Sequence, residues 1–269
     1  MRGPDGTALP IEVRRLLKSK ATPSHRRGRR SLFGPLKRAV GGLSRGGGRP
    51  SSEHWIGDTS LENFLPIARR LSAQDVLVSV IGGNQYAVFG TIQHPQPFDF
   101  YLPAMGSGDI DPDVELIPFR PLYQYFAESL RLGDGQTIAA LRNSTKAQIV
   151  HLVAPPPKRE NEYIEEHHDT LFAAAGISSL GVSAPGLRMK FWELQNCAIE
   201  EICAELGIET LPPPADAADA DGFLGRAFYA GDATHANARY GELVLQQLER
   251  KFGPQLPALE QPAVAAAGA

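Results

Sequence analysis

The sequence predicts an α/β fold, a three-layer α/β/α sandwich built around a mostly parallel sheet. The chain has 269 residues, 42% of them hydrophobic, and this size and composition suit one sizeable α/β core. Short apolar runs typical of buried strands alternate with longer segments that have the 3.6-residue periodicity of helices. Alternation of this kind is typical of a sheet covered by helices.

Each predicted element follows from a local pattern. Residues 9–17 favour a strand, and the segment 56–60, Ile-Gly-Asp-Thr-Ser, favours a glycine turn that opens a helix. Residues 75–81 predict a buried strand that ends in Gly-Gly-Asn at 82–84. The later part of the chain predicts helices over 118–132, 188–206 and 240–252, a weaker helix over 137–141 and a short strand over 208–211.

The loop 94–103, rich in proline and aromatic residues, follows the Gly-Gly-Asn turn. Loops at the carboxyl ends of parallel strands bind ligands in α/β proteins, so this loop is well placed to shape a pocket. It is equally well suited to cover the core through Phe98 and Phe100.

One short motif carries chemistry, because Asp232 precedes His235 by three residues just ahead of the helix predicted over 240–252. A carboxylate held beside an imidazole orients it and tunes it as a general base. The alternative interpretation is that Asp232 only caps the following helix.

The order of these motifs resembles the SGNH/GDSL hydrolase family, over roughly residues 56–248. The resemblance implies that the Gly57 backbone N–H and the Asn84 side chain donate to an oxyanion hole. It implies that Asp232 and His235 are the acid and base of a serine triad. It also implies a fourth strand that runs into a proline turn at 151–157, and a flavodoxin-like strand order of 2-1-3-4-5.

The sequence departs from the family at its first block, the Gly-Asp-Ser turn whose serine is the nucleophile, which is absent from residues 1–55. Ser60 does not replace that serine, since only one helix and one strand separate it from Asn84. We therefore expect residues 9–17 to be the second strand of the family. A strand, the serine and a helix, about 20 to 30 residues or one strand–helix unit, would then belong upstream of Met1.

Charge divides the chain. Residues 1–50 hold thirteen Lys and Arg against two acidic residues, although the net charge of the whole chain is −3. Arginines can bind nucleic acid, but no aromatic residue interleaves them as a base-stacking platform requires. We therefore expect a basic flexible insertion at about 18–52 within an incomplete N-terminal part, 1–55. The α/β domain would span 56–252, and a disordered tail 253–269.

Other features narrow the function. No apolar run is long enough to span a bilayer and no signal peptide opens the chain, so we expect a cytoplasmic protein. Cys197 and Cys203 lie six positions apart on one predicted helix, which favours reduced packing residues. The acidic and histidine run at 165–169 favours a solvated helical face over a metal site.

The family resemblance implies a serine ester hydrolase that cleaves a small-molecule or glycan acyl ester through an acyl-enzyme, and it implies no metal or organic cofactor. The alternative is a catalytically inactive SGNH-fold protein that binds a ligand or acts as a scaffold. A third hypothesis is an anion-binding interaction protein in which the basic insertion is the working part.

Overall fold

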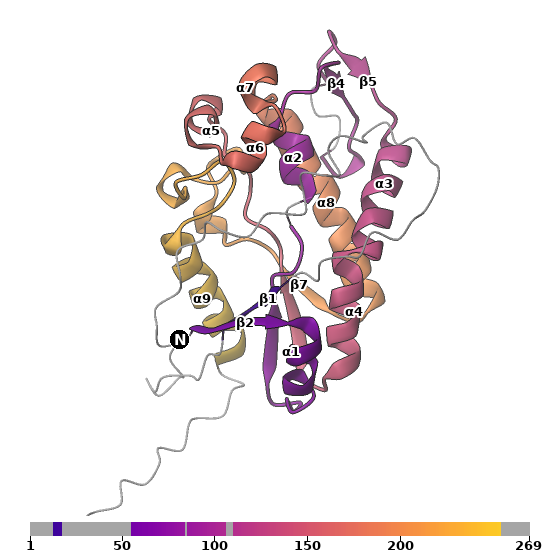
Figure 1. The fold of residues 1–269 in the computed structure, drawn as a ribbon, viewed down its shortest axis with the longest axis vertical. Coiled ribbons are helices and arrows are strands. Elements are labelled where there is room, and N and C mark those ends of the chain that lie inside the picture. The colour runs from indigo at the N-terminus through magenta and orange to yellow at the C-terminus, as the bar shows by residue number, and fades with distance from the viewer. Residues whose placement is uncertain (1–12, 18–54, 84, 106–109, 254–269) are drawn as a thin grey trace, which may run out of the picture.

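A three-stranded parallel sheet lies at the centre of this mixed α/β fold, as the computed structural model shows (Figure 1). The structure describes residues 13–17, 55–83, 85–105 and 110–253. The strands β3 (Val76–Ser79), β6 (Gln148–Leu152) and β7 (Glu209–Leu211) are ordered β3-β6-β7. Because all three run in the same direction, the loops that follow them meet at one edge of the sheet.

Helices pack on β6 through two hydrophobic clusters. Ile149 belongs to a cluster with residues of α3 (Phe119–Leu132), α4 (Asp134–Ser144) and α8 (Pro185–Glu205). The next residue, Val150, packs with Leu248 and Phe252 of α9 (Ala238–Phe252). Successive side chains of a strand point to opposite faces, so the two clusters lie on opposite sides of the sheet. Figure 1 shows α9 on one side and α8 with α4 on the other.

Local signals set the ends of these helices. Pro185 occupies the first turn of α8, where a missing N–H costs nothing. The side chain of Asn237 caps α9 by accepting from the backbone N–H groups of Arg239 and Tyr240. Asp232 is therefore not the cap of this helix, which removes the alternative interpretation of the Asp-His motif.

The glycine turn predicted at 56–60 is wrong. Gly57 lies inside strand β2 (Trp55–Ser60), opposite Arg14 of β1 (Val13–Leu17), and the two strands form a separate parallel sheet. Tryptophan, isoleucine and threonine around Gly57 favour a strand, and pairing with β1 outweighs the local turn preference of glycine. Helix α1 (Leu61–Ala68) starts afterwards, with Ser60 as its cap.

Strand β3 has one neighbour among the described strands, β6, and β1 pairs there only with β2. Val78 and Val80, on one side of β3, are 40% and 69% exposed. The strand order that the family resemblance implies would place a further strand between residues 9–17 and β3.

The predicted cover loop at 94–103 contributes to the core. Phe100 is fully buried and packs edge-on against Phe191, with ring centroids 5.2 Å apart. Asp99 is also buried, and both of its carboxylate oxygens accept from Lys190, at 2.8 and 2.7 Å. Asp99 is therefore a structural partner of Lys190.

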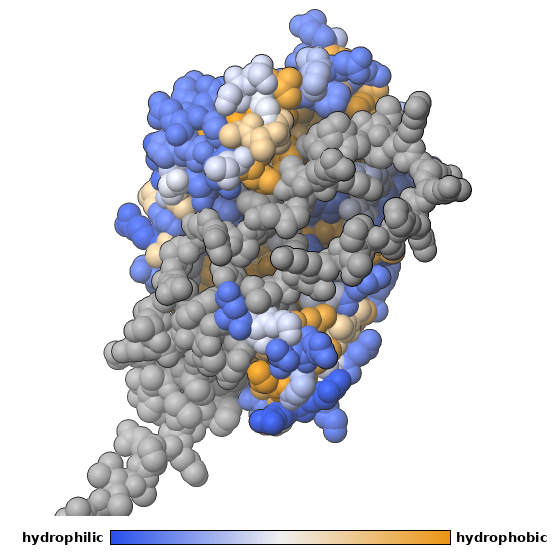
Figure 2. Space-filling view, in the orientation of Figure 1, coloured by the Kyte–Doolittle hydropathy of each residue, from blue (hydrophilic) through white to orange (hydrophobic). Residues whose placement is uncertain are grey.

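The remaining elements surround this frame. The run at 165–169 does not form one helix, because α5 ends at His167 and Asp169 caps α6. Glu165 and Glu166 are exposed, and the surface around α5 is mainly hydrophilic in Figure 2. The other bounds are α2 (Gln85–Thr91), β4 (Phe98–Asp99), η3 (Pro103–Met105), β5 (Glu115–Leu116), α5 (Asn161–His167), α6 (Thr170–Ala174), α7 (Ile177–Leu180), η4 (Ala215–Ala217) and η5 (Arg226–Phe228).

Three expectations concern residues beyond this description. The basic segment 18–52 and residues 254–269 of the predicted tail lie outside the described residues, as does Asn84. Within the described part of the chain, no helix combines the length and the apolar character that crossing a bilayer requires.

Candidate active site

Asp232 and His235 are in direct contact in the loop between η5 and α9. Oδ2 of Asp232 lies 2.8 Å from Nδ1 of His235. The other carboxylate oxygen of Asp232 accepts from the backbone N–H groups of Thr234 and His235, at 2.9 and 2.7 Å. Three contacts therefore fix the carboxylate, and the carboxylate fixes the imidazole with Nε2 turned away from it.

Each member of this pair shifts the pKa of the other. Burial opposes ionisation of Asp232, but hydrogen bonds from the side chain and backbone of His235 outweigh burial and hold the carboxyl pKa well below its usual range. The same side-chain hydrogen bond raises the pKa of His235, against an opposing effect of partial burial. The Asp232 carboxylate therefore stabilises the imidazolium that forms when a general base accepts a proton.

Lys158 supports this loop from inside the protein. Its side chain is fully buried, and Nζ donates to the carbonyl oxygens of Ala230, at 2.8 Å, and Asp232, at 2.5 Å. Nζ also lies 3.8 Å from Oδ1 of Asp232. Burial lowers the pKa of Lys158 to about 8, while the Asp232 charge opposes that change. No signal in the sequence identified Lys158, because its role depends on contacts more than 70 positions away.

The imidazole of His235 lines a cavity of about 280 Å³ at the carboxyl ends of the parallel strands. The loops after β3, β6 and β7 and the first turns of α9 form its walls. Its lining residues are Val80, Gly82, Gly83, His151, Leu152, Val153, Ala154, Pro155, Ile199, Leu211, Pro212, Pro214, His235, Tyr240, Val244 and Gln247. This edge of the sheet is where α/β proteins bind ligands.

Two glycines shape the wall of this cavity after β3. Gly82 and Gly83 have φ values of 95° and 87°, in the region that favours glycine. A Cβ on Gly83 would lie 3.0 Å from Cβ of Ala154, in the loop after β6. The predicted Gly-Gly-Asn turn thus lets two loops approach closely, directly before Asn84.

A second histidine, His151, lines the same cavity and was not predicted to belong to the site. It is buried in β6, and its Nδ1 lies 3.2 Å from Oγ of Ser79 in β3. Burial lowers the pKa of His151 to about 4, although the charge of Asp134 raises it slightly. His151 is therefore neutral at pH 7, and only its position at the end of a buried strand hinted at a place in the site.

The structure brings together some of the predicted site residues. Asp232 and His235 are in contact, whereas Asn84 lies outside the described residues. Gly57 lies in strand β2, not in the glycine turn predicted for it. No serine, threonine or cysteine of the described chain lines the His235 cavity.

The described residues contain no group of three or more His, Cys, Asp or Glu side chains placed to hold a metal ion. Comparisons of the sequence with protein-family models and with curated proteins find no match.

Proposed function

We propose that this protein is an ester hydrolase in which His235 is the general base and Asp232 orients it. The 2.8 Å contact between Oδ2 of Asp232 and Nδ1 of His235, on a cavity at the carboxyl edge of the sheet, carries the proposal. This contact leaves Nε2 of His235 to exchange protons with a reacting group.

The proposed reaction has two stages. A serine hydroxyl attacks the ester carbonyl as His235 accepts its proton, and the tetrahedral oxyanion collapses to an acyl-enzyme while the protonated His235 returns the proton to the leaving alcohol. Water then attacks the acyl-enzyme with His235 again as base, which releases the acid and the serine. The oxyanion donors in this proposal are Asn84 and the N–H of Gly57, as the family resemblance implies.

The serine also comes from the resemblance, as part of a Gly-Asp-Ser turn. In the proposed three-layer sandwich this turn follows a strand beside β3. The separation of β1 from β3, and the edge of β3 that pairs with no described strand, support a place for such a strand. The substrate would be a small-molecule or glycan acyl ester, and the proposed compartment is the cytoplasm.

Covalent labelling of the protein isolated from its own cells tests this proposal. A fluorophosphonate should label one serine, and peptide mapping should place it in a Gly-Asp-Ser sequence. His235→Ala should lower hydrolysis of a p-nitrophenyl ester by roughly 10²- to 10⁴-fold, the usual contribution of a general base. His94→Ala, at a histidine that lines no part of the His235 cavity, should leave the rate unchanged.

The second candidate is a noncatalytic binding or scaffold protein with the same fold. No serine, threonine or cysteine is among the described residues that line the His235 cavity, which favours this candidate. Absence of both labelling and ester cleavage over a broad panel of acyl esters, in a protein that is folded by circular dichroism, would select this candidate.

A further inference from the structure

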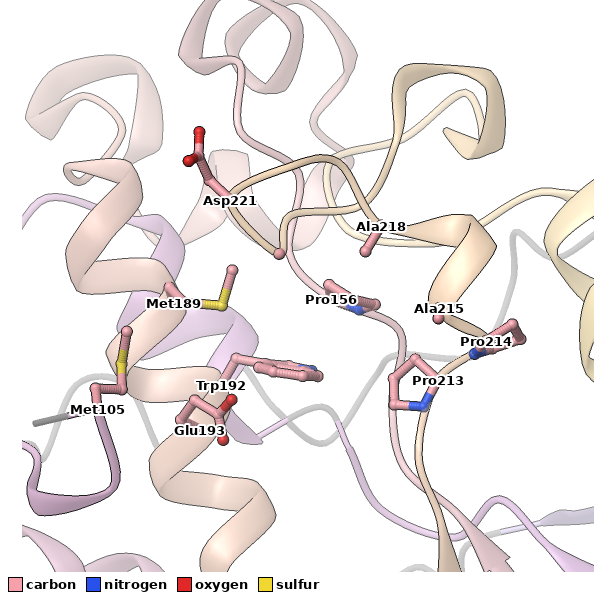
Figure 3. Close-up of a pocket in the computed structure, with 11 residues that line it drawn as sticks. Met105, Pro156, Met189, Trp192, Glu193, Pro213, Pro214, Ala215, Ala218 and Asp221 are labelled. Carbon is pink, nitrogen blue, oxygen red and sulfur yellow. The ribbon is translucent and has the colours of Figure 1, made fainter.

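Figure 3 shows a second cavity, of about 310 Å³. Helix α8 forms one wall, and the loops after β6 and β7 form the opposite wall. Pro214 lines both cavities. The volume falls within the range of small-molecule sites, about 300–1,000 Å³.

The wall of this cavity is mostly apolar and polarisable. Met189 and Trp192 of α8 and Met105 of η3 line it, facing the prolines of the two loops. Nε1 of Trp192 donates to the carbonyl oxygen of Ala154 at 3.1 Å, which fixes the indole against the loop after β6. Aromatic and thioether side chains of this kind provide a surface for the apolar part of a ligand.

The charge of this cavity is negative. Glu193 and Asp221 are the charged side chains among its described lining residues, and no described lysine or arginine lines it. Asp221 pairs with Nη2 of Arg159, and Figure 3 shows its carboxylate directed away from the cavity. No hydrogen bond or ion pair joins the carboxylate of Glu193 to a described residue, and this carboxylate lies beside the indole of Trp192 in Figure 3.

Glu193 is partly buried, and no lysine or arginine of the described chain forms an ion pair with it. Burial raises the pKa of its carboxyl, and the charge of Glu200 adds to the effect. A bound cation would oppose both effects on the pKa of Glu193, whereas a bound anion would place a second negative charge beside Glu193.

We propose that this cavity binds an organic cation, an ammonium group carried on an apolar body, with Glu193 facing the ammonium and Trp192 and Met189 contacting the apolar part. An ammonium group is attracted both by the face of an aromatic ring and by a carboxylate, because each of them favours positive charge. This site goes beyond the proposed hydrolysis, because binding requires neither His235 nor a nucleophile.

Calorimetric titration of the full chain with three probes tests the proposal. The probes are the cation benzyltrimethylammonium, the neutral benzyl alcohol and the anion benzoate. All three carry an aromatic ring, so they differ mainly in charge. We expect the cation to bind about tenfold more tightly than the alcohol, and benzoate to bind more weakly than either.

Matched variants locate the effect. Glu193→Gln should remove most of the preference for the cation, whereas Glu128→Gln, the same charge change on an exposed face of α3, should leave it intact. Trp192→Phe should weaken all three probes. His235→Ala should bind the cation like the wild-type chain, so a failed hydrolase proposal leaves this result unchanged.

Three outcomes overturn the inference. They are equal affinity for cation and alcohol, an unaltered preference in Glu193→Gln, and no measurable binding of the cation. Circular dichroism of each variant shows that a loss of binding is not a loss of fold.

Discussion

His151 and His235 line the same cavity, and their surroundings shift their pKa values in opposite directions. His151 enters from a buried strand, where the protein excludes water from the imidazole and favours its neutral form. His235 enters from a surface loop, where the Asp232 carboxylate favours its protonated form. The two histidines therefore contribute to stability with opposite dependences on pH.

His151→Gln is expected to flatten the acid limb of the stability profile. In the unfolded chain a histidine takes up a proton near pH 6.5, whereas folded His151 does so at about 4. Between these values the unfolded state binds more protons, so wild-type stability falls as the pH falls, by roughly 3 kcal/mol at most. Urea unfolding at pH 4.5 and 7.5 measures this difference, and an identical pH slope in both proteins would refute it.

Asp232→Asn is expected to lower the pKa of His235. The substitution keeps an acceptor oxygen but removes the charge that stabilises the imidazolium. In the wild-type protein the raised pKa contributes stability that is complete below the unfolded pKa, about 6.5, and is lost as the pH rises through the folded pKa. NMR titration of the His235 ring protons checks the shift. Asp216→Asn, on an exposed turn, is the matched control and should not change the titration.

Lys158→Met is expected to destabilise the protein and to raise the pKa of His235 further. The variant leaves the carbonyl oxygen of Asp232 without its donor, which costs about 1–3 kcal/mol for an unsatisfied buried group, whereas the carbonyl oxygen of Ala230 keeps the hydrogen bond from the Tyr163 hydroxyl. It also removes a positive charge that lowers the pKa of His235. Lys146→Met, at an exposed position, should change neither quantity. A variant whose urea midpoint drops while the His235 titration stays in place would limit Lys158 to a packing role.

The sequence predicted best where one face of an element is buried. The apolar runs at 75–81 and 208–211 form the strands β3 and β7, which lie on either side of β6. The helical periodicity of residues 118–132 predicted α3. These elements are predictable because their apolar residues follow the period of the face that is buried. At 56–60 the prediction was wrong, because Gly57 pairs with Arg14, a residue too distant in the sequence for a local pattern to indicate.

The candidate site was predictable only where its partners are close in sequence. Asp232 and His235 lie three positions apart, so one motif revealed them. Lys158 and His151 reach the site through buried contacts between segments that are distant in the sequence. Neither their residue types nor their spacing from Asp232 and His235 indicates that they belong to the site. The structural role of Asp99 likewise depends on a distant residue, because its carboxylate accepts a hydrogen bond from Lys190 of α8.

Lys190→Met is expected to destabilise the protein by about 3–5 kcal/mol, because it leaves the buried carboxylate of Asp99 without its countercharge. Asp99→Asn alone should also be costly, as it removes the carboxylate charge that faces the buried ammonium of Lys190. The double variant should lose less stability than the sum of the single changes. Urea unfolding of the four proteins measures this coupling, and strictly additive losses would show that the two charges do not depend on each other.

Val80→Lys is expected to reduce self-association. Val80 follows β3, which is an edge strand among the described strands, and an exposed apolar edge is a template for pairing with another chain. Leu132→Lys is the matched control, because Leu132 is 75% exposed but ends a helix. Light scattering over a range of protein concentrations should show a smaller associated fraction for Val80→Lys than for the wild-type chain or Leu132→Lys. Both changes should alter the unfolding free energy by less than about 0.5 kcal/mol, as is usual for exposed positions. An equal decrease for the two variants would mean that exposed apolar area drives association, without a specific contribution from the strand edge.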